Sequence, residues 1–161
     1  MDRKEEIKKI RSSILKCKNY DAILSVIKKS AFRRYYVSYK RGLQRQMREE
    51  RLAYSQSPKT PKIAMEYQYK MSSLGGKLGG AMRKYRQNIV LYLTYYILNG
   101  SEYSAWKIRK IQQKIFGISV SDEILAEHFS DTDRTPGTRI EVNIDKTRID
   151  DAKAIFALLR R

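Results

Sequence analysis

Residues 81–98 read AMRKYRQNIVLYLTYYIL, and this stretch decides the fold class. From Asn88 onward it is apolar on nearly every side, whereas a helix at a protein surface is apolar on one stripe only. We therefore expect residues 81–98 to form the most buried helix of the chain, with Asn99 and Gly100 as its C-terminal cap. Its apolar run of ten residues, 89–98, is too short to span a membrane, because a spanning helix needs about 20.

Helical periodicity continues toward the N-terminus. The first apolar face comprises Ile7, Ile10, Ile14 and Cys17. A short second helix is expected to have Asn19 or Asp21 as its N-cap and Ile23, Leu24 and Ile27 as its apolar residues. A third helix is expected over residues 30–53, with an apolar stripe formed by Phe32, Tyr36, Tyr39, Leu43 and Met47. Because Glu50 falls in line with this stripe, we expect the packing to end near Met47.

Two stretches rich in proline or glycine interrupt the pattern. Residues 55–61 (SQSPKTP) predict a loop, in which Thr60 caps the next helix and Pro61 is its first residue. Residues 75–80 (GGKLGG) predict a break after that helix. The break could be a flexible hinge, a place where small residues let two helices pack closely, or a backbone cradle that binds an anion. It is not a P-loop, because Lys77 is not followed by Ser or Thr.

Residues 101–161 are expected to combine helices with one strand. Ser101 caps a helix that ends near Gly117, and Ser119 or Ser121 caps a shorter one. Residues 139–145 alternate apolar and polar residues, which is typical of a strand. Thr147 and Asp150 resemble a capping box for the final helix. We predict a mainly α fold: a helical bundle of about six to eight helices with one short β-strand near the C-terminus.

The charge is uneven along the chain. The 161 residues include 34 Lys and Arg against 17 Asp and Glu, a net charge of +17. Residues 1–120 hold 27 basic and 8 acidic residues, whereas residues 121–161 hold 7 and 9. A strongly basic balance indicates a polyanionic partner. We expect three regions: a basic helical region over 1–57, a helical core over 58–130 and a near-neutral β-α tail over 131–161.

The scarce residue types exclude several classes of protein. A single cysteine, Cys17, cannot form an internal disulfide, and a single histidine, His128, excludes zinc sites built from several His or Cys ligands. The charged N-terminus is not a signal peptide. We therefore expect an intracellular protein, cytoplasmic or associated with a nucleoid or a virion, with no cofactor, no metal, no membrane partner and no enzymatic activity.

Residues 28–51 carry the strongest functional signal. They hold nine basic residues, six of them Arg, and only two acidic ones. Arg presents a planar fork that binds phosphate through two hydrogen bonds, and a helix face of one charge sign repels itself unless a polyanion lies on it. The alternative is a solvated face that only keeps the protein in solution. The expected nucleic-acid-binding residues here are Arg33, Arg34, Lys40, Arg41, Arg45, Arg48 and Arg51.

Two further basic groups are expected to contribute. The first surrounds GGKLGG and comprises Lys77, Arg83, Lys84 and Arg86. The second comprises Lys107, Arg109, Lys110 and Lys114. Among the twelve tyrosines, Tyr36, Tyr39, Tyr92 and Tyr96 are expected to fill packing positions. Tyr35 and Tyr69 lie nearer the boundaries of the apolar faces and are better placed to stack on bases.

Residues 102–129 also suggest a helix-turn-helix, which would place its second helix in a DNA major groove. That helix carries Asp122, Glu123 and Glu127, which phosphate would repel. These residues, with His128, Asp131 and Asp133, could form a metal site, a surface acidic cap or a docking site for another subunit. The loop is not an EF-hand, since its sixth position is Pro136.

The sequence thus predicts a non-enzymatic protein that binds the phosphate backbone of DNA or RNA, as part of a nucleoprotein assembly or by self-association. One alternative is a helix-turn-helix DNA-binding regulator. Another is an inhibitor or adaptor that binds the nucleic-acid site of a second protein. Composition and spacing do not choose between DNA and RNA or between single and double strands.

Overall fold

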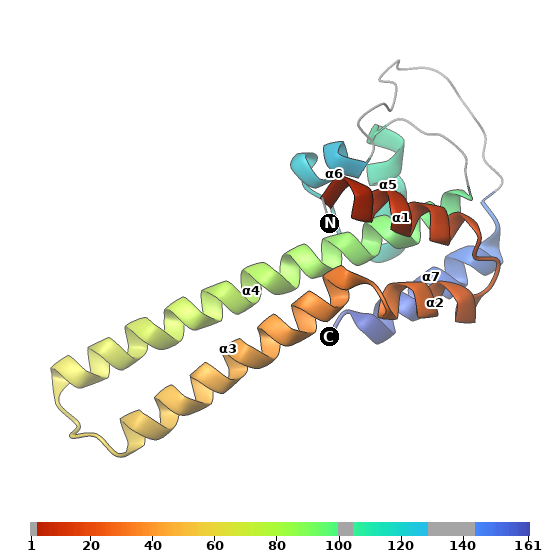
Figure 1. Ribbon diagram of the computed structural model, residues 1–161. Helices are drawn as coiled ribbons and strands as arrows, with labels where there is room; N and C mark the ends of the chain where they lie inside the picture. Colours follow the sequence, from red (N-terminus) through yellow and green to blue (C-terminus); the bar gives the residue numbers. More distant parts are fainter. Residues whose placement is uncertain (1–2, 100–104, 129–143) are drawn as a thin grey trace. The chain divides into compact units, whose positions relative to one another are not determined.

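The computed structural model describes residues 3–99, 105–128 and 144–161 (Figure 1). Seven helices lie in these ranges: α1 (Arg3–Leu15), α2 (Tyr20–Lys28), α3 (Ala31–Ser55), α4 (Pro61–Leu98), α5 (Ala105–Phe116), α6 (Asp122–His128) and α7 (Lys146–Leu159). The described ranges contain no strand, so the predicted mainly α class is confirmed. The predicted strand over 139–145 is not seen: residues 139–143 lie outside the description, and Ile144 and Asp145 are not in a strand.

The chain divides into two compact units. Ala31–Tyr85 forms the hairpin unit, which contains α3 and the greater part of α4. Met1–Ser30 and Arg86–Arg161 form the core unit, which contains the last turns of α4 and the other five helices. The domain boundary expected between residues 57 and 58 falls in the loop between α3 and α4.

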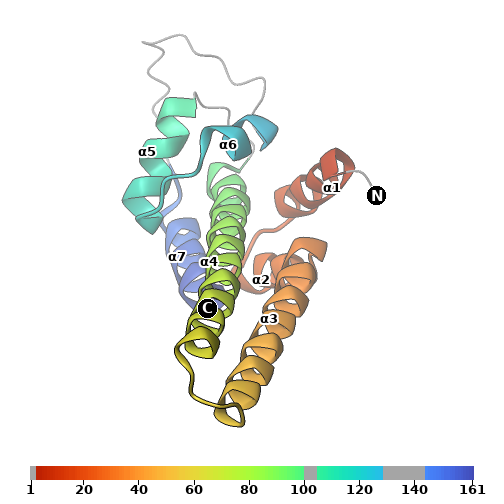
Figure 2. The same ribbon diagram turned by 90° about the vertical axis from the view of Figure 1, so that its left-hand side faces the viewer.

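The end of α4 is the centre of the core unit (Figure 2). All ten residues from 89 to 98 are buried, as the all-round apolar sequence predicted. Three helices contact this segment: Arg11 of α1 lies 4.4 Å from the centroid of the Tyr95 ring, the Gln112 side chain of α5 donates a hydrogen bond to Thr94, and α7 contacts Tyr96. In addition, α2 packs against α1 and α7, and α5 packs against α7. A helix that is apolar all round is stable here because neighbours cover its sides.

The N-terminal helices follow their predicted faces. The predicted first apolar face is buried: Ile7, Ile10 and Ile14 of α1, and Cys17 just after it, are each less than 9% exposed. Of the two N-caps considered for α2, the structure has Asn19, whose Oδ1 accepts a hydrogen bond from the Ala22 amide at 2.9 Å. This bond satisfies one of the amides that a helix start leaves without a partner.

The start of α7 corrects one prediction. Its N-cap is Asp145 rather than Thr147, and Asp145 Oδ1 accepts a hydrogen bond of 2.9 Å from the Thr147 amide. A carboxylate at this position satisfies a free amide and also interacts favourably with the positive end of the helix dipole. Asp145 was predicted to be the last polar residue of the alternating strand 139–145. In the structure its side chain caps α7 instead.

The hairpin unit consists of two antiparallel helices that lie side by side in both views (Figures 1 and 2). Tyr36 stacks on Tyr85 with 3.9 Å between ring centroids, and Leu43 and Leu74 are buried further along. Near the connecting loop, the ring of Tyr54 in α3 stacks on that of Tyr67 in α4, with 4.2 Å between their centroids. The expectation that packing ends near Met47 was therefore wrong, because aromatic stacking continues beyond it.

The GGKLGG segment corrects a second prediction. Residues 75–80 lie inside the continuous helix α4, so they separate no helices and form no loop cradle for an anion. Among the described residues, a Cβ atom built on any of the four glycines would meet nothing within 4 Å, so these glycines do not serve close packing there. Glycine costs only about 1 kcal/mol per residue in a helix, which the long helical segments on both sides outweigh.

Candidate nucleic-acid interface

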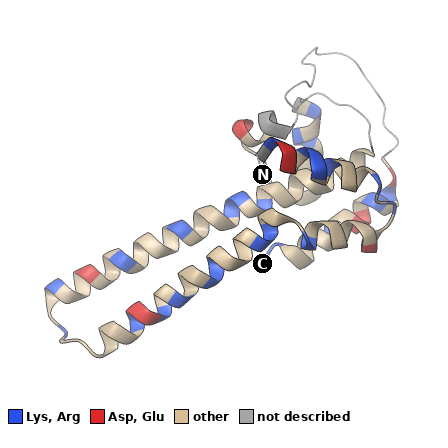
Figure 3. Ribbon diagram, viewed as in Figure 1, with Lys and Arg blue, Asp and Glu red and all other residues tan. Residues whose placement is uncertain are grey.

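Four arginines form a line along α3, which we call the arginine stripe: Arg34, Arg41, Arg45 and Arg48. At 100° per residue they lie within about 60° of one another, and over about 21 Å of helix length. All four are exposed. The buried residues Tyr36 and Leu43 lie on the opposite side of α3, so the stripe faces away from α4. Figure 3 shows the basic residues distributed along both helices of the hairpin unit.

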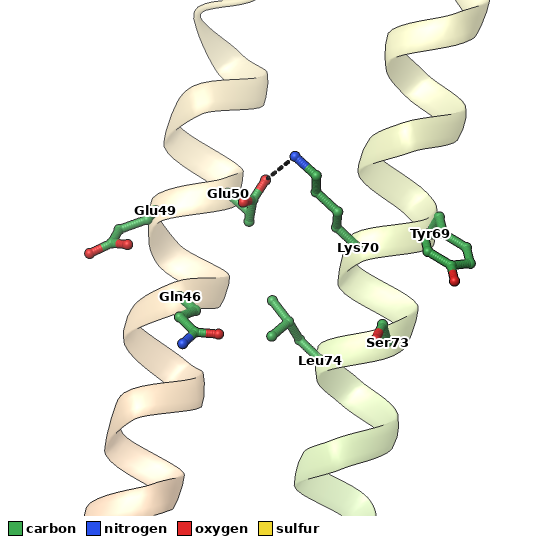
Figure 4. A pocket seen from close by; sticks show the side chains of 7 residues that line it. All are labelled: Gln46, Glu49, Glu50, Tyr69, Lys70, Ser73 and Leu74. Atoms are coloured by element: carbon green, nitrogen blue, oxygen red, sulfur yellow. Dashed lines mark ion pairs between the residues drawn. The ribbon is translucent and has the colours of Figure 1, made fainter.

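The stripe has one acidic neighbour, Glu49, which is exposed and forms no ion pair with it among the described residues. Among the described residues, none of its four arginines forms an ion pair. The acidic Glu50 instead lies on the inner side of α3, where its Oε2 is 3.7 Å from Lys70 Nζ of α4 (Figure 4). Residues 31–85 hold 13 basic and 3 acidic residues, net +10, whereas the rest of the chain holds 21 and 14, net +7. Positive charge is therefore concentrated in the hairpin unit.

The other predicted residues of α3 differ in their surroundings. Arg33 is half-buried and lies close to the Tyr85 hydroxyl. Burial raises the pKa of Tyr85, and the nearby Arg33 guanidinium opposes that shift. Lys40 Nζ lies 5.9 Å from the centroid of the Tyr36 ring. Arg51 is exposed at the flank of the stripe. Arg33 is thus the α3 residue whose charge is directed into the hairpin.

The predicted basic residues of α4 fall in both units. Lys77, Arg83 and Lys84 are exposed in the hairpin unit. Lys77 and Lys84 are seven residues apart and so lie on nearly the same side of α4. Arg86 belongs to the core unit, where its Nε donates a hydrogen bond of 2.9 Å to the Arg160 carbonyl at the end of α7. A residue that ties two helices together is less available to a ligand than an exposed one.

The four predicted residues of α5 also belong to the core unit. Lys114 is exposed, whereas Arg109 forms an ion pair with Asp122 of α6. Lys110 Nζ lies 3.9 Å from the centroid of the Trp106 ring. Lys107 is partly buried. Ten of the fifteen predicted binding residues therefore lie in the hairpin unit and five in the core unit.

The tyrosines divide as their spacing predicted. Tyr36, Tyr92 and Tyr96 are buried, whereas Tyr35 is 71% exposed and Tyr69 is 78% exposed. Tyr39 is half-buried, with its ring against Tyr35. The sequence prediction did not include the exposed Trp106. Its place on α5 beside Lys107 and one turn before Lys110 is the signal that could have identified it.

The predicted acidic cluster is described only in part. Asp122 and Glu123 are exposed on α6, while the side chains of Glu127, His128, Asp131 and Asp133 lie outside the described residues. Within the described residues, no three His, Cys, Asp or Glu side chains are grouped as a metal site would require. The helix pair α5 and α6 does occur in helix-turn-helix order, with a second helix of seven residues.

A shallow pocket of about 260 Å³ lies between α3 and α4 (Figure 4). Its lining residues are Gln46, Glu49, Glu50, Tyr69, Lys70, Ser73 and Leu74. The Glu50–Lys70 ion pair crosses it, so its two opposite charges already neutralise each other. Tyr69 points away from α3 and the pocket centre (Figure 4).

Within the described ranges, no helix has the length and apolar character needed to cross a membrane.

The chain matches no known protein-family model, no curated protein and no solved structure.

Proposed function

We propose that this protein binds nucleic acid and that the arginine stripe of α3 contacts the phosphate backbone. The observation that carries the proposal is a line of four exposed arginines without ion pairs, on a unit with a net charge of +10. Like charges at i, i+3 and i, i+4 destabilise a helix, and a polyanion lying along the stripe relieves that repulsion. Over about 21 Å, one strand of B-form DNA presents about six phosphates, enough for all four arginines.

The proposal predicts binding with strong salt dependence and little sequence preference. Phosphate contacts position a protein without reading sequence, and each neutralised phosphate releases condensed counterions. Changing Arg34, Arg41, Arg45 and Arg48 together to Gln should lower the slope of log affinity against log salt by about 3 to 4 units. Gln preserves helix propensity, so the helicity measured by circular dichroism should stay the same.

A matched control separates the stripe from total charge. Changing Lys4, Lys8, Lys9 and Lys16 to Gln removes the same charge from exposed positions of the core unit. This control should reduce the salt slope far less than the stripe variant. Equal reductions would show that binding follows the total charge, and an unchanged slope in a folded stripe variant would reject the proposal.

The proposal extends to a nucleoprotein assembly built by self-association or with other subunits. The core unit exposes Asp122 and Glu123, which are of opposite charge to the hairpin unit. Contacts between unlike surfaces of neighbouring copies produce open rows of subunits when they do not close into a ring. Binding should then become cooperative as the nucleic acid is lengthened, and affinity per site that is independent of length would argue against assembly.

The same titrations distinguish two other functions. A helix-turn-helix regulator using α5 and α6 would prefer one palindromic duplex sequence over others. An inhibitor or adaptor would bind a protein tightly at a ratio of one to one and free nucleic acid weakly. The acidic start of α6, with Asp122 and Glu123 exposed, makes the first of these less favourable than the basic hairpin.

A further inference from the structure

Three large aromatic side chains are strongly exposed among the described residues: Tyr35, Tyr69 and Trp106. Each is adjacent in sequence to a basic residue, namely Arg34, Lys70 or Lys107. Exposed aromatic rings leave a large apolar area in water, and burial of that area by a ligand is favourable. Tyr35 and Tyr69 both belong to the hairpin unit, so their positions can be compared with that of the arginine stripe.

The Tyr35 ring lies beside one neighbouring ring and is otherwise largely exposed. Its centroid lies 5.9 Å from that of Tyr39, and the two planes differ by 12°, so the rings are parallel and offset. Of the two residues one turn earlier, Ala31 has only a methyl group to offer the other face, and the Phe32 ring lies against Tyr85 of α4, with 5.9 Å between centroids. An exposure of 71% is consistent with this open face. A ring already held by a neighbour loses little freedom when a flat ligand stacks on it.

Nucleic-acid bases are flat groups of this kind, but they are accessible only in some states of the polymer. In a duplex the base faces are stacked on one another, and a protein reaches base edges and the backbone. In a single strand the bases can turn outward and stack on aromatic side chains. An exposed aromatic ring beside a phosphate-binding stripe therefore favours a single strand over a duplex.

Tyr35 lies on the same helix as the stripe, whereas Tyr69 lies on the far side of the neighbouring helix α4. Tyr35 follows Arg34 directly and lies about 100° around α3 from it, on the flank between the stripe and the face that packs on α4. A strand whose phosphates follow the stripe can thus turn a base onto Tyr35. Tyr69 lies on the side of α4 that faces away from α3 (Figure 4), while the stripe faces away from α4. Tyr69 is therefore out of reach of the same strand.

We infer that the hairpin unit binds single-stranded nucleic acid in preference to duplex, with a base stacked on the open face of Tyr35. The inference rests on the proposed function, since the arginine stripe supplies the phosphate contacts. Stacking uses the base face and not the sugar, so DNA and RNA single strands are expected to bind alike.

The test compares labelled oligo(dT), oligo(U) and a mixed-sequence duplex of equal length by fluorescence anisotropy with the full chain. Tyr35→Leu should weaken binding of both single strands by about 5- to 100-fold and leave duplex binding unchanged. Tyr35→Phe keeps the ring and should keep the affinity. Tyr69→Leu is the matched control, because it removes an equally exposed tyrosine from the opposite side of the hairpin unit and should have no effect.

A second measurement reports stacking directly. The chain has one tryptophan, so Tyr35→Trp in a Trp106→Phe background places the only indole at the proposed site. Its fluorescence should be quenched when oligo(dT) binds. Three results would each overturn the inference: equal affinity for duplex and single strands, equal effects of Tyr35→Leu and Tyr69→Leu, or an indole that is not quenched at saturation.

These failures are distinct from failure of the proposed function. If the wild-type chain binds duplex and single strands equally, with a salt slope that depends on the arginine stripe, the proposed function stands and the inference about Tyr35 falls. If the wild-type chain binds none of the three nucleic acids at low salt, both fall together.

Discussion

The Tyr96 hydroxyl donates a hydrogen bond of 3.0 Å to Asp151 Oδ2, joining the buried end of α4 to α7. Arg148, one turn earlier on α7, donates a hydrogen bond of 2.9 Å to the Tyr96 carbonyl, and its guanidinium lies 4.7 Å from the centroid of the Tyr96 ring. The ring itself is 1% exposed. One tyrosine thus anchors the last helix of the chain through its hydroxyl, its carbonyl and its ring face.

This arrangement predicts that stability falls at alkaline pH. Burial, followed by the hydrogen bond to Asp151, raises the pKa of Tyr96 from 10.0 to about 12. Between these values the unfolded chain loses a proton that the folded chain keeps, so stability falls as pH rises, by up to about 1.4 kcal/mol per pH unit. Well below pH 10 the Tyr96 hydroxyl keeps its proton in both states, so it does not make the free energy of unfolding depend on pH. Burial also raises the pKa of Tyr95 and Tyr85, which acts in the same direction.

Urea unfolding at several pH values from 9 to 11 measures this effect. The variant Tyr96→Phe cannot ionise and should show a smaller loss of stability over that range. If the wild-type protein and the variant lose stability with the same slope, the buried hydroxyl does not couple folding to proton binding.

The glycines of α4 predict an unusual gain in stability. Alanine at positions 75, 76, 79 and 80 meets open space and keeps the helical backbone, so each change should stabilise the protein by about 0.5 to 1 kcal/mol. Gly117→Ala is the control: its Cβ also meets open space, but its φ of +68° disfavours alanine, so it should destabilise. Thermal unfolding followed by circular dichroism measures both. Destabilisation by the α4 substitutions would contradict the open space around these four positions.

Gln112 predicts a stabilising core substitution. It is fully buried, its Nε2 donates a hydrogen bond of 3.3 Å to Thr94 Oγ1, and its Oε1 has no partner among the described residues. Met has a similar shape and no unsatisfied carbonyl, so Gln112→Met should raise the free energy of unfolding by about 1 kcal/mol. Thr94→Val should instead destabilise, because it leaves Gln112 Nε2 without an acceptor. A less stable Gln112→Met variant would indicate that Oε1 has a partner, such as a buried water molecule.

Cys17 is expected to be unreactive in the folded protein. It is 4% exposed, its Sγ donates to the Ser13 carbonyl at 3.2 Å, and burial raises the thiol pKa although Arg148 opposes the shift. The thiolate is the reactive form, so a thiol reagent near pH 8 should modify Cys17 only as fast as the chain opens. Urea should therefore accelerate labelling sharply. Rapid labelling without urea, at a rate proportional to reagent concentration, would contradict this burial.

The helical faces could be predicted because each depends on residues close in sequence. Ile7, Ile10 and Ile14 are spaced three and four residues apart, so they lie on one face of the helix and are buried together. The start of α4 could be predicted for a similar reason. The Thr60 Oγ1 accepts a hydrogen bond of 3.3 Å from the Ile63 amide, and Pro61 has no amide hydrogen to leave unsatisfied.

The errors came from features that depend on residues far away in sequence or on weak local preferences. Arg33 and Arg34 are adjacent and were both assigned to the polar face of α3, but Arg33 is half-buried close to Tyr85 of α4. No single helix reveals that partner. The glycines of 75–80 suggested a break because glycine ends many helices, yet here none adopts the left-handed conformation of a helix end.

The stacking of Tyr36 on Tyr85 has a consequence for the order of folding. The core unit requires residues 1–30 to meet residues 86–161, and the 55 residues between them form a loop that must close. The hairpin unit needs only neighbouring segments, so it can form first and bring its two ends together at this tyrosine pair. A loop shortened in this way lowers the entropic cost of closure by about 2 kcal/mol. Formation of the α3–α4 hairpin would then accelerate folding of the core unit, and weakening the Tyr36–Tyr85 pair would slow it.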